Sequence, residues 1–238
     1  YRYSKDTSDT ILNFIKRFKE RVWLTHQVAL EFNRNRIHVI HEQEKAYNEF
    51  RSNSLLKTQE GLLKELSTKR HPFITTKLQG EFKKVFDNIE KELKTSEDKY
   101  KEMISNDKLY DELDKVFEKY IGEPYGKEDL KKVLKEAKER FDDLIPPGYE
   151  DIKKSGDRKY GEYILWKQLL EFGKKTKKPI ILISDDDKPD WWWFLNKGNN
   201  IGPRPELIIE INEFAKVDFY MYTAENFIKH ASGFFKET

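Results

Sequence analysis

Three consecutive aspartates, Asp185–Asp187, come one residue after a short apolar run, Ile180–Ile183, and they are the side chains of this sequence best placed for chemistry. A run this short and rich in β-branched residues predicts a strand buried on both faces, as in a parallel sheet. Ligand sites in open α/β sheets lie at the carboxyl ends of strands. Crowded carboxylates there repel one another unless they share a cation or a proton. We therefore expect a divalent metal, with Asp185 as the main ligand and Asp186 or Asp187 in support.

Two glutamates could complete such a site. Glu31 lies on a predicted helix after the candidate strand Val22–Leu24, and Glu162 opens a predicted helix over 160–172. This helix and the strand after it return to the same edge, so Glu162 and Asp185 are expected to meet. Carboxylates suit Mg²⁺ or Mn²⁺, and these ions generate hydroxide nucleophiles for phosphodiester cleavage. The alternative for each acid is an ordinary surface position, and the helix dipole alone favours a carboxylate at Glu162.

Basic and aromatic side chains could bind a nucleic-acid substrate. Arg34 and Arg36 could hold a phosphate, and Lys167 could contact one from the 160–172 helix. Surface salt bridges and a solvated lysine are the alternative interpretations. Trp191–Trp193 could stack on unpaired bases, but we expect at least two of these three side chains to be buried in the core.

Hydrophobic periodicity predicts the elements that position these residues. Helical spacing covers 7–18, a long helix after Thr25, and three amphipathic stripes between about 50 and 145. Pro146-Pro147-Gly148-Tyr149 ends this helical block as a rigid turn. The remaining sequence alternates between helices and strands, which favours an α/β fold with a parallel sheet. The predicted helices are at 160–172, 207–214 and 223–235, and the predicted strands are at 180–183 and 219–222.

The composition narrows the class of protein. The 238 residues suffice for one large domain or two small ones, and an aromatic content of 14% is too high for a disordered chain. The sequence has no cysteine, which excludes disulfides and thiol chemistry and favours a cytoplasmic setting. No apolar run approaches the length of a membrane span, and no phosphate-binding loop motif occurs. His38 and His41 are one helical turn apart, but without a third ligand a zinc site is not expected.

Several motifs together resemble the PIN-like domains found in bacterial proteins. The similarity covers roughly 1–45 and 145–238. The motifs are Pro146-Pro-Gly-Tyr, Tyr160-Gly-Glu-Tyr-Ile-Leu-Trp-Lys167, Ile180-Ile-Leu-Ile-Ser-Asp-Asp-Asp-Lys-Pro-Asp-Trp-Trp192, Gly202-Pro-Arg-Pro-Glu-Leu207 and Phe219-Tyr-Met-Tyr-Thr223. The resemblance implies a three-layer α/β domain with a parallel sheet over 1–48 and 145–238, and a large all-helical insertion over 49–144.

The resemblance also implies a metal-dependent nuclease that cleaves phosphodiester bonds, with RNA rather than DNA as the expected substrate. Such domains use four acidic positions around Mg²⁺ or Mn²⁺, and three are carried over here. They are Glu31, Glu162 (where the family more usually has aspartate) and Asp185, with Asp186 as its neighbour. The implied setting is bacterial defence or toxicity, in the cytoplasm and away from membranes.

The fourth acidic position of the family lies on an N-terminal strand just before a segment similar to Tyr1-Arg2-Tyr3. The expectation is therefore that this sequence lacks the first strand and its aspartate. On that expectation the chain is a weak or inactive enzyme unless another acid substitutes. The second hypothesis is accordingly a PIN-like binding module whose helical insertion docks a partner such as an ATPase. A third is a structural helical protein whose acidic run is only a solvated turn.

Overall fold

A computed structural model describes residues 1–66, 76–195, 198 and 200–236. The chain divides into two compact units. The first contains Tyr1–Lys5 and Phe32–Asp114, and the second contains Asp6–Glu31 and Lys115–Thr238. The helices are α1 (Lys5–Phe18), α2 (His26–Phe50), α3 (Leu56–Leu66), α4 (Thr76–Ser105), α5 (Lys108–Phe117), α6 (Lys127–Asp142), α7 (Gly161–Thr176), α8 (Pro205–Ala215) and α9 (Ala224–Lys236). The strands are β1 (Ile180–Ile183), β2 (Trp192–Phe194), β3 (Asn200–Pro203) and β4 (Phe219–Tyr222).

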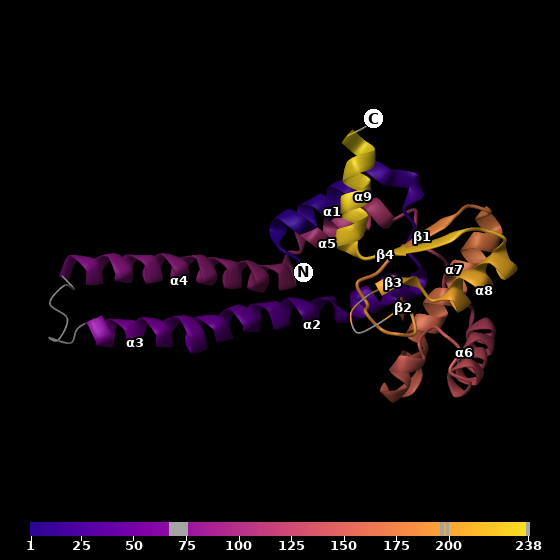
Figure 1. Cartoon of the computed structure of the whole chain (residues 1–238), viewed down its shortest axis with the longest axis horizontal. Helices are drawn as coiled ribbons and strands as arrows, with labels where there is room; N and C mark the ends of the chain where they lie inside the picture. Colours follow the sequence, from indigo (N-terminus) through magenta and orange to yellow (C-terminus); the bar gives the residue numbers. More distant parts are fainter. Residues whose placement is uncertain (67–75, 196–197, 199, 237–238) are drawn as a thin grey trace. The chain divides into compact units, whose positions relative to one another are not determined.

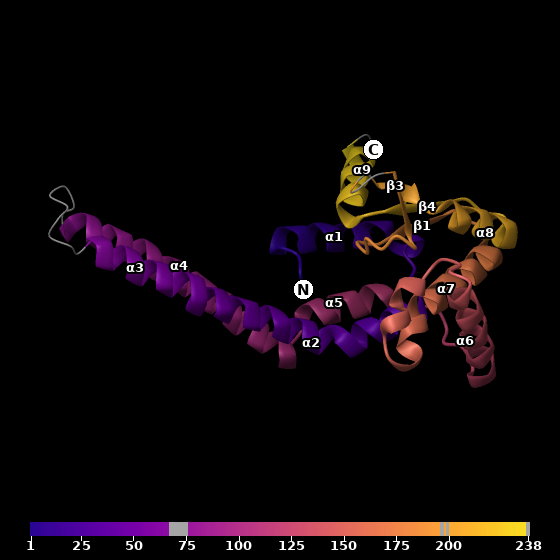
Figure 2. The same cartoon turned by 60° about the horizontal axis from the view of Figure 1, so that its bottom comes forward.

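The first unit is helical, as the amphipathic stripes predict. A π-helical turn, Arg51–Leu55, joins α2 to α3, and α4 runs alongside them (Figures 1 and 2). The ring centroids of Tyr47 on α2 and Tyr100 on α4 are 5.5 Å apart. Arg51 lies 3.7 Å from the buried carboxylate of Glu97. An aromatic contact and an ion pair with a buried glutamate thus connect α4 to α2 and to the π-helical turn after it.

The second unit contains the core and the predicted parallel sheet. β1 and β4 pair in parallel, from Ile180 opposite Phe219 to Ile183 opposite Tyr222. Two predicted strands, 180–183 and 219–222, therefore agree with the structure residue for residue. Residues of α7 and α8 fill the core, among them the fully buried Tyr163, Trp166, Leu207 and Ile211. The chain is mostly helical with a small parallel sheet, which is compatible with the expected α/β class.

The expectation that β1 is buried on both faces is wrong. Ile180 is buried, but Ile181 and Ile183 are 51% and 44% exposed. Tyr220 on β4 is 47% exposed on the same strand pair. The reason is that the core cluster covers alternate residues of a two-stranded sheet, so each strand has one packed and one open face. All four residues of β1 are therefore apolar, although only one face of the strand packs against the core.

Two of the three consecutive tryptophans, Trp191–Trp193, are buried in the core. Trp191 and Trp192 are 4% and 3% exposed, and Trp193 is half exposed. The prediction that at least two of them are buried is confirmed. β2 pairs with β3 in an antiparallel arrangement that places Trp192 opposite Pro203. The indole of Trp191 packs edge-on against Trp166 at a centroid distance of 6.1 Å.

The predicted strand at Val22–Leu24 is reduced to one bridge. Leu24 donates to the Tyr120 carbonyl at 2.9 Å and accepts from Gly122 at 2.8 Å, as one parallel bridge. Pairing goes no further because Thr25 already caps α2, with its hydroxyl accepting from the Val28 N–H at 3.2 Å. In the part of the chain that the structure describes, no helix is long and apolar enough to cross a membrane.

Candidate functional site

Glu162 lies in the first turn of α7, where the helix dipole favours a carboxylate. Its Oε2 accepts a hydrogen bond from the indole Nε1 of Trp191 at 2.9 Å. Its Oε1 contacts the Nζ of Lys188. Trp191 is itself fixed in the core, so the indole holds the Glu162 carboxylate in one orientation toward Lys188.

Three carboxylates converge on the Lys188 ammonium. Besides Glu162, its Nζ lies 2.8 Å from Asp151 Oδ1 and 3.3 Å from Asp186 Oδ2. We call Asp151, Glu162, Asp186 and Lys188 the Lys188 cluster. All of its members belong to the second unit. It joins three segments of the chain: the turn after α6, the start of α7 and the loop after β1.

The pKa values in the cluster differ because burial and charge act in opposite directions. Burial raises the pKa of Glu162 to about 7, and the nearby Asp151 charge adds to this, while Lys188 opposes it. Burial also disfavours the charge of Asp151, but hydrogen bonds from Lys154 and Lys188 hold its pKa below the ordinary value. Burial opposes the Lys188 charge too, yet the surrounding carboxylates raise its pKa. Of the two carboxylates Asp151 and Glu162, Glu162 is therefore the one that takes up a proton more readily.

Asp190 and Gly148 position the turn that carries Asp151. The buried Oδ2 of Asp190 accepts from the Gly148 N–H at 2.7 Å and from the Glu150 N–H at 3.2 Å. Gly148 has φ of 101°, and a Cβ there would lie 2.9 Å from the Phe141 ring and 3.2 Å from Glu162 Cβ. Only glycine fits this position without strain.

Sequence reasoning missed Asp151 as a member of the site. The side chain is buried, with only 7% of its surface exposed. The available signal was its position, two residues after the Tyr149 that ends the Pro-Pro-Gly-Tyr turn. The corresponding sequence signal for Lys188 was that it is the only basic residue between the aspartate run and the tryptophans.

Glu31 lies close to the start of α7. Its Oε1 accepts from Gln27 Nε2 at 2.6 Å and occupies the space that a Cβ on Gly161 would need. Gln27 is anchored in turn, because its N–H donates to Gln168 Oε1 at 3.1 Å. The structure thus brings Glu31 against the residue that precedes Glu162.

Asp185 has a different contact from the one expected. Its Oδ1 accepts the N–H of Ala224, the first residue of α9, at 2.8 Å. This is the contact of a residue that caps a helix N-terminus. Asp186, the expected supporting residue, is the one that reaches Lys188. Asp187 is exposed.

Of the three residues expected to bind phosphate, two belong to the other unit and the third is paired with a glutamate. Arg34 and Arg36 belong to the first unit. Arg36 forms an ion pair with Asp107 at 2.5 Å. Lys167, in the second unit, lies 2.9 Å from both carboxylate oxygens of Glu136.

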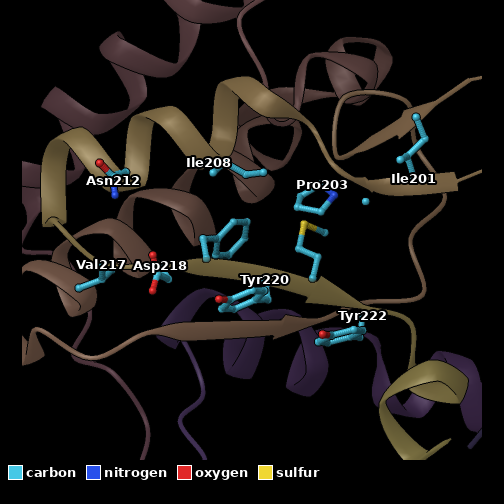
Figure 3. Close-up of a pocket in the computed structure, with 11 residues that line it drawn as sticks. Ile201, Pro203, Ile208, Asn212, Val217, Asp218, Tyr220 and Tyr222 are labelled. Atoms are coloured by element: carbon cyan, nitrogen blue, oxygen red, sulfur yellow. The ribbon is translucent and has the colours of Figure 1, made fainter. Parts of the chain in front are cut away.

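A separate pocket of about 430 Å³ lies between β3, α8 and β4 (Figure 3). Ile201, Ile208 and Tyr220 line it together with Asn212 and Asp218. No member of the Lys188 cluster lines it. This mainly apolar hollow is thus distinct from the acidic site.

Among the residues that the structure describes, no three Asp, Glu or His side chains are arranged to hold a metal ion as they stand. The donor set is nevertheless the right one, because carboxylate oxygens are the ligands that Mg²⁺ and Mn²⁺ prefer. The Lys188 ammonium is a stand-in cation in contact with three of these carboxylates. The chemistry of the donor set therefore suits a small hard cation, whereas its present arrangement is that of ligands around an ammonium group.

Comparison with known proteins supports one assignment. A family model described as a PIN like domain matches residues 1–207. No curated protein and no solved structure matches the chain. The family model covers most of the sequence, including every member of the Lys188 cluster. The chain belongs to the PIN-like domain family.

Proposed function

We propose that this protein is a metal-dependent nuclease that cleaves phosphodiester bonds, with RNA as the preferred substrate. The observation that carries this proposal is the convergence of Asp151, Glu162 and Asp186 on one cationic atom within a PIN-like domain. Membership of the family supports a nuclease ancestry. As part of the same proposal, the protein acts in the cytoplasm, in bacterial defence or as a toxin.

In this proposal Asp151, Glu162 and Asp186 hold Mg²⁺ or Mn²⁺. Glu31, beside Gly161, and Asp185, next to Asp186, are candidates for the remaining positions. The bound ion would supply an activated water and stabilise the charge that develops on the phosphate oxygens. The chain's own contribution is orientation: the Trp191 indole fixes Glu162, and Asp190 fixes the turn that carries Asp151. Such supporting contacts hold metal ligands in place.

The test is cleavage of end-labelled single-stranded RNA and DNA with Mg²⁺, with Mn²⁺ or with chelator. We expect RNA cleavage that needs the metal and that falls at least about 100-fold in Asp186→Asn, because even supporting residues of metal sites carry effects of 10–100-fold. Asp187→Asn is the matched control, since Asp187 is the exposed neighbour of the same type. Equal activity of the two variants would contradict the assignment of Asp186.

A binding module is the second candidate, and two observations favour it. The cluster is already partly neutralised by Lys188, so its acids can be retained for structure alone. The helical first unit also exposes apolar side chains, among them Phe50, Phe82 and Val85. A partner protein docking on those helices is the function in this case. Lack of any Mn²⁺-dependent stabilisation would favour it over the nuclease.

A further inference from the structure

Lys188 differs from Lys154, the other lysine that contacts the cluster, in how its charge is held. Its side chain is 25% exposed and contacts three carboxylates from three segments of the chain. Lys154, which pairs with the same Asp151, is 55% exposed and comes from the same short turn. A cation at the Lys188 position is therefore shared by the whole cluster, whereas Lys154 neutralises one member at its edge.

We propose that Lys188 is an internal cation that competes with the divalent metal for these carboxylates, so that metal binding requires the ammonium group to leave. The proposal rests on the function proposed above and specifies how the same site is controlled. It makes Lys188 the residue that sets the metal affinity. In the metal-free protein it keeps the acids together and partly neutral.

Electrostatic repulsion opposes the presence of both cations in the cluster. An ammonium group and a divalent ion repel one another, and within a few ångströms of shared ligands this repulsion is strong in a partly buried site. Nζ contacts one oxygen of Asp151 and one of Glu162, and the other oxygen of each carboxylate already accepts from Lys154 or from the Trp191 indole. One cation at a time can therefore use the two oxygens that contact Nζ.

The Lys188 side chain can leave the cluster without disturbing its backbone. The Lys188 N–H donates to Asp186 Oδ1 at 3.0 Å, and its carbonyl accepts the N–H groups of Trp191 and Trp192 at 3.1 Å each. These bonds fix the loop while the four-carbon stem of the side chain stays free to rotate. Moving the ammonium toward solvent therefore needs only side-chain rotation, and it brings a positive charge to the rim of the site.

The test is titration of Mn²⁺ alone into the wild-type protein and the Lys188→Met variant, followed by calorimetry. Methionine keeps a similar length and removes the charge. We expect the Mn²⁺ affinity to rise at least about tenfold in the variant, because one like charge is removed from the contact shell. Lys154→Met is the matched control, and we expect a change below about threefold from a group that is largely exposed.

A second measurement uses the wild-type protein, in case Lys188→Met fails to fold. Acetylation of lysine amines is followed by mass spectrometry with and without Mn²⁺. We expect Lys188 to be modified faster when Mn²⁺ is bound, and the exposed Lys131 and Lys132 at an unchanged rate. Unchanged labelling of Lys188 in Mn²⁺-loaded protein would overturn the proposal.

The outcomes separate this inference from the function on which it rests. Equal Mn²⁺ affinity of the wild-type protein and Lys188→Met refutes competition and leaves the metal-dependent nuclease standing. No Mn²⁺ binding by either protein contradicts the nuclease itself. Tighter binding by Lys188→Met, with Lys154→Met unchanged, supports both.

Discussion

At the residue scale, the most informative side chain is Glu162. Its side chain is mostly buried beside Trp191, next to both Lys188 and Asp151. Burial outweighs the favourable ammonium contact, so the pKa of its carboxyl rises to about 7 instead of falling. The metal-free site therefore contains a carboxyl group that changes charge near neutral pH.

The raised pKa of Glu162 predicts how stability depends on pH. The folded state keeps the Glu162 proton up to about pH 7, whereas the unfolded chain loses it near the ordinary pKa of 4.5. Stability from this group is therefore present below about pH 4.5 and is lost as pH rises through 7. We expect Glu162→Gln to remove that decline, which is on the order of 3 kcal/mol because a pKa difference of one corresponds to about 1.4 kcal/mol.

The measurement is urea denaturation of both proteins in chelator between pH 4.5 and 8. Histidines titrate in the same window, so the difference between the two proteins is the quantity to compare. A stability difference that is constant over this range would refute the raised pKa.

The site was only partly predictable from sequence at this scale. Glu162 and Asp186 follow from acids placed at the ends of predicted elements, and both are in the Lys188 cluster. Asp151 and Lys188 do not, because their contact spans 37 positions of the chain and depends on how one turn is folded. Residue spacing predicts contacts within an element, whereas contacts made by a tertiary turn escape it.

At the element scale, periodicity predicted the helices and the two parallel strands, including the bounds of β1 and β4. It failed for Val22–Leu24, because one bridge to Ile121 is all that the following helix cap allows. It also overstated the burial of β1, since an apolar run records side-chain type and not the number of layers that pack on it. The turn before α7 is the element on which the site depends most.

That turn yields a prediction for Gly148→Ala. The positive φ and the 2.9 Å approach to the Phe141 ring both oppose a Cβ. We expect a loss of roughly 2–4 kcal/mol in the free energy of unfolding, from backbone strain and overpacking together. Gly156→Ala is the control: its φ of 64° is also left-handed, but nothing lies within 4 Å of an added Cβ.

Denaturant unfolding of both variants measures the difference directly. Gly156→Ala is expected to cost only about 1 kcal/mol, from backbone strain alone. Similar losses in the two variants would show that the Phe141 and Glu162 contacts at Gly148 do not constrain the turn.

At the scale of the whole molecule, the charge is nearly balanced at +2, so long-range attraction to a polyanion is weak. In the proposed nuclease, recognition of the nucleic acid therefore depends on local groups. The Lys188 cluster lies entirely in the second unit, with Glu31 and Asp185. Arg34 and Arg36 lie in the first unit and take no part in the proposed metal site. The proposed metal site therefore lies entirely within the second unit.

The most direct test of that claim is the Mn²⁺-induced rise in melting temperature of the full chain, compared with Asp151→Asn and Asp157→Asn. Asp157 is an exposed aspartate just past the same turn and serves as the charge-matched control. A ligand that binds only the folded state stabilises it to an extent that grows with its affinity. We predict that Mn²⁺ raises the melting temperature of the wild-type protein and of Asp157→Asn, and that Asp151→Asn loses most of this rise. An equal rise in all three proteins would contradict the Lys188 cluster as the metal site.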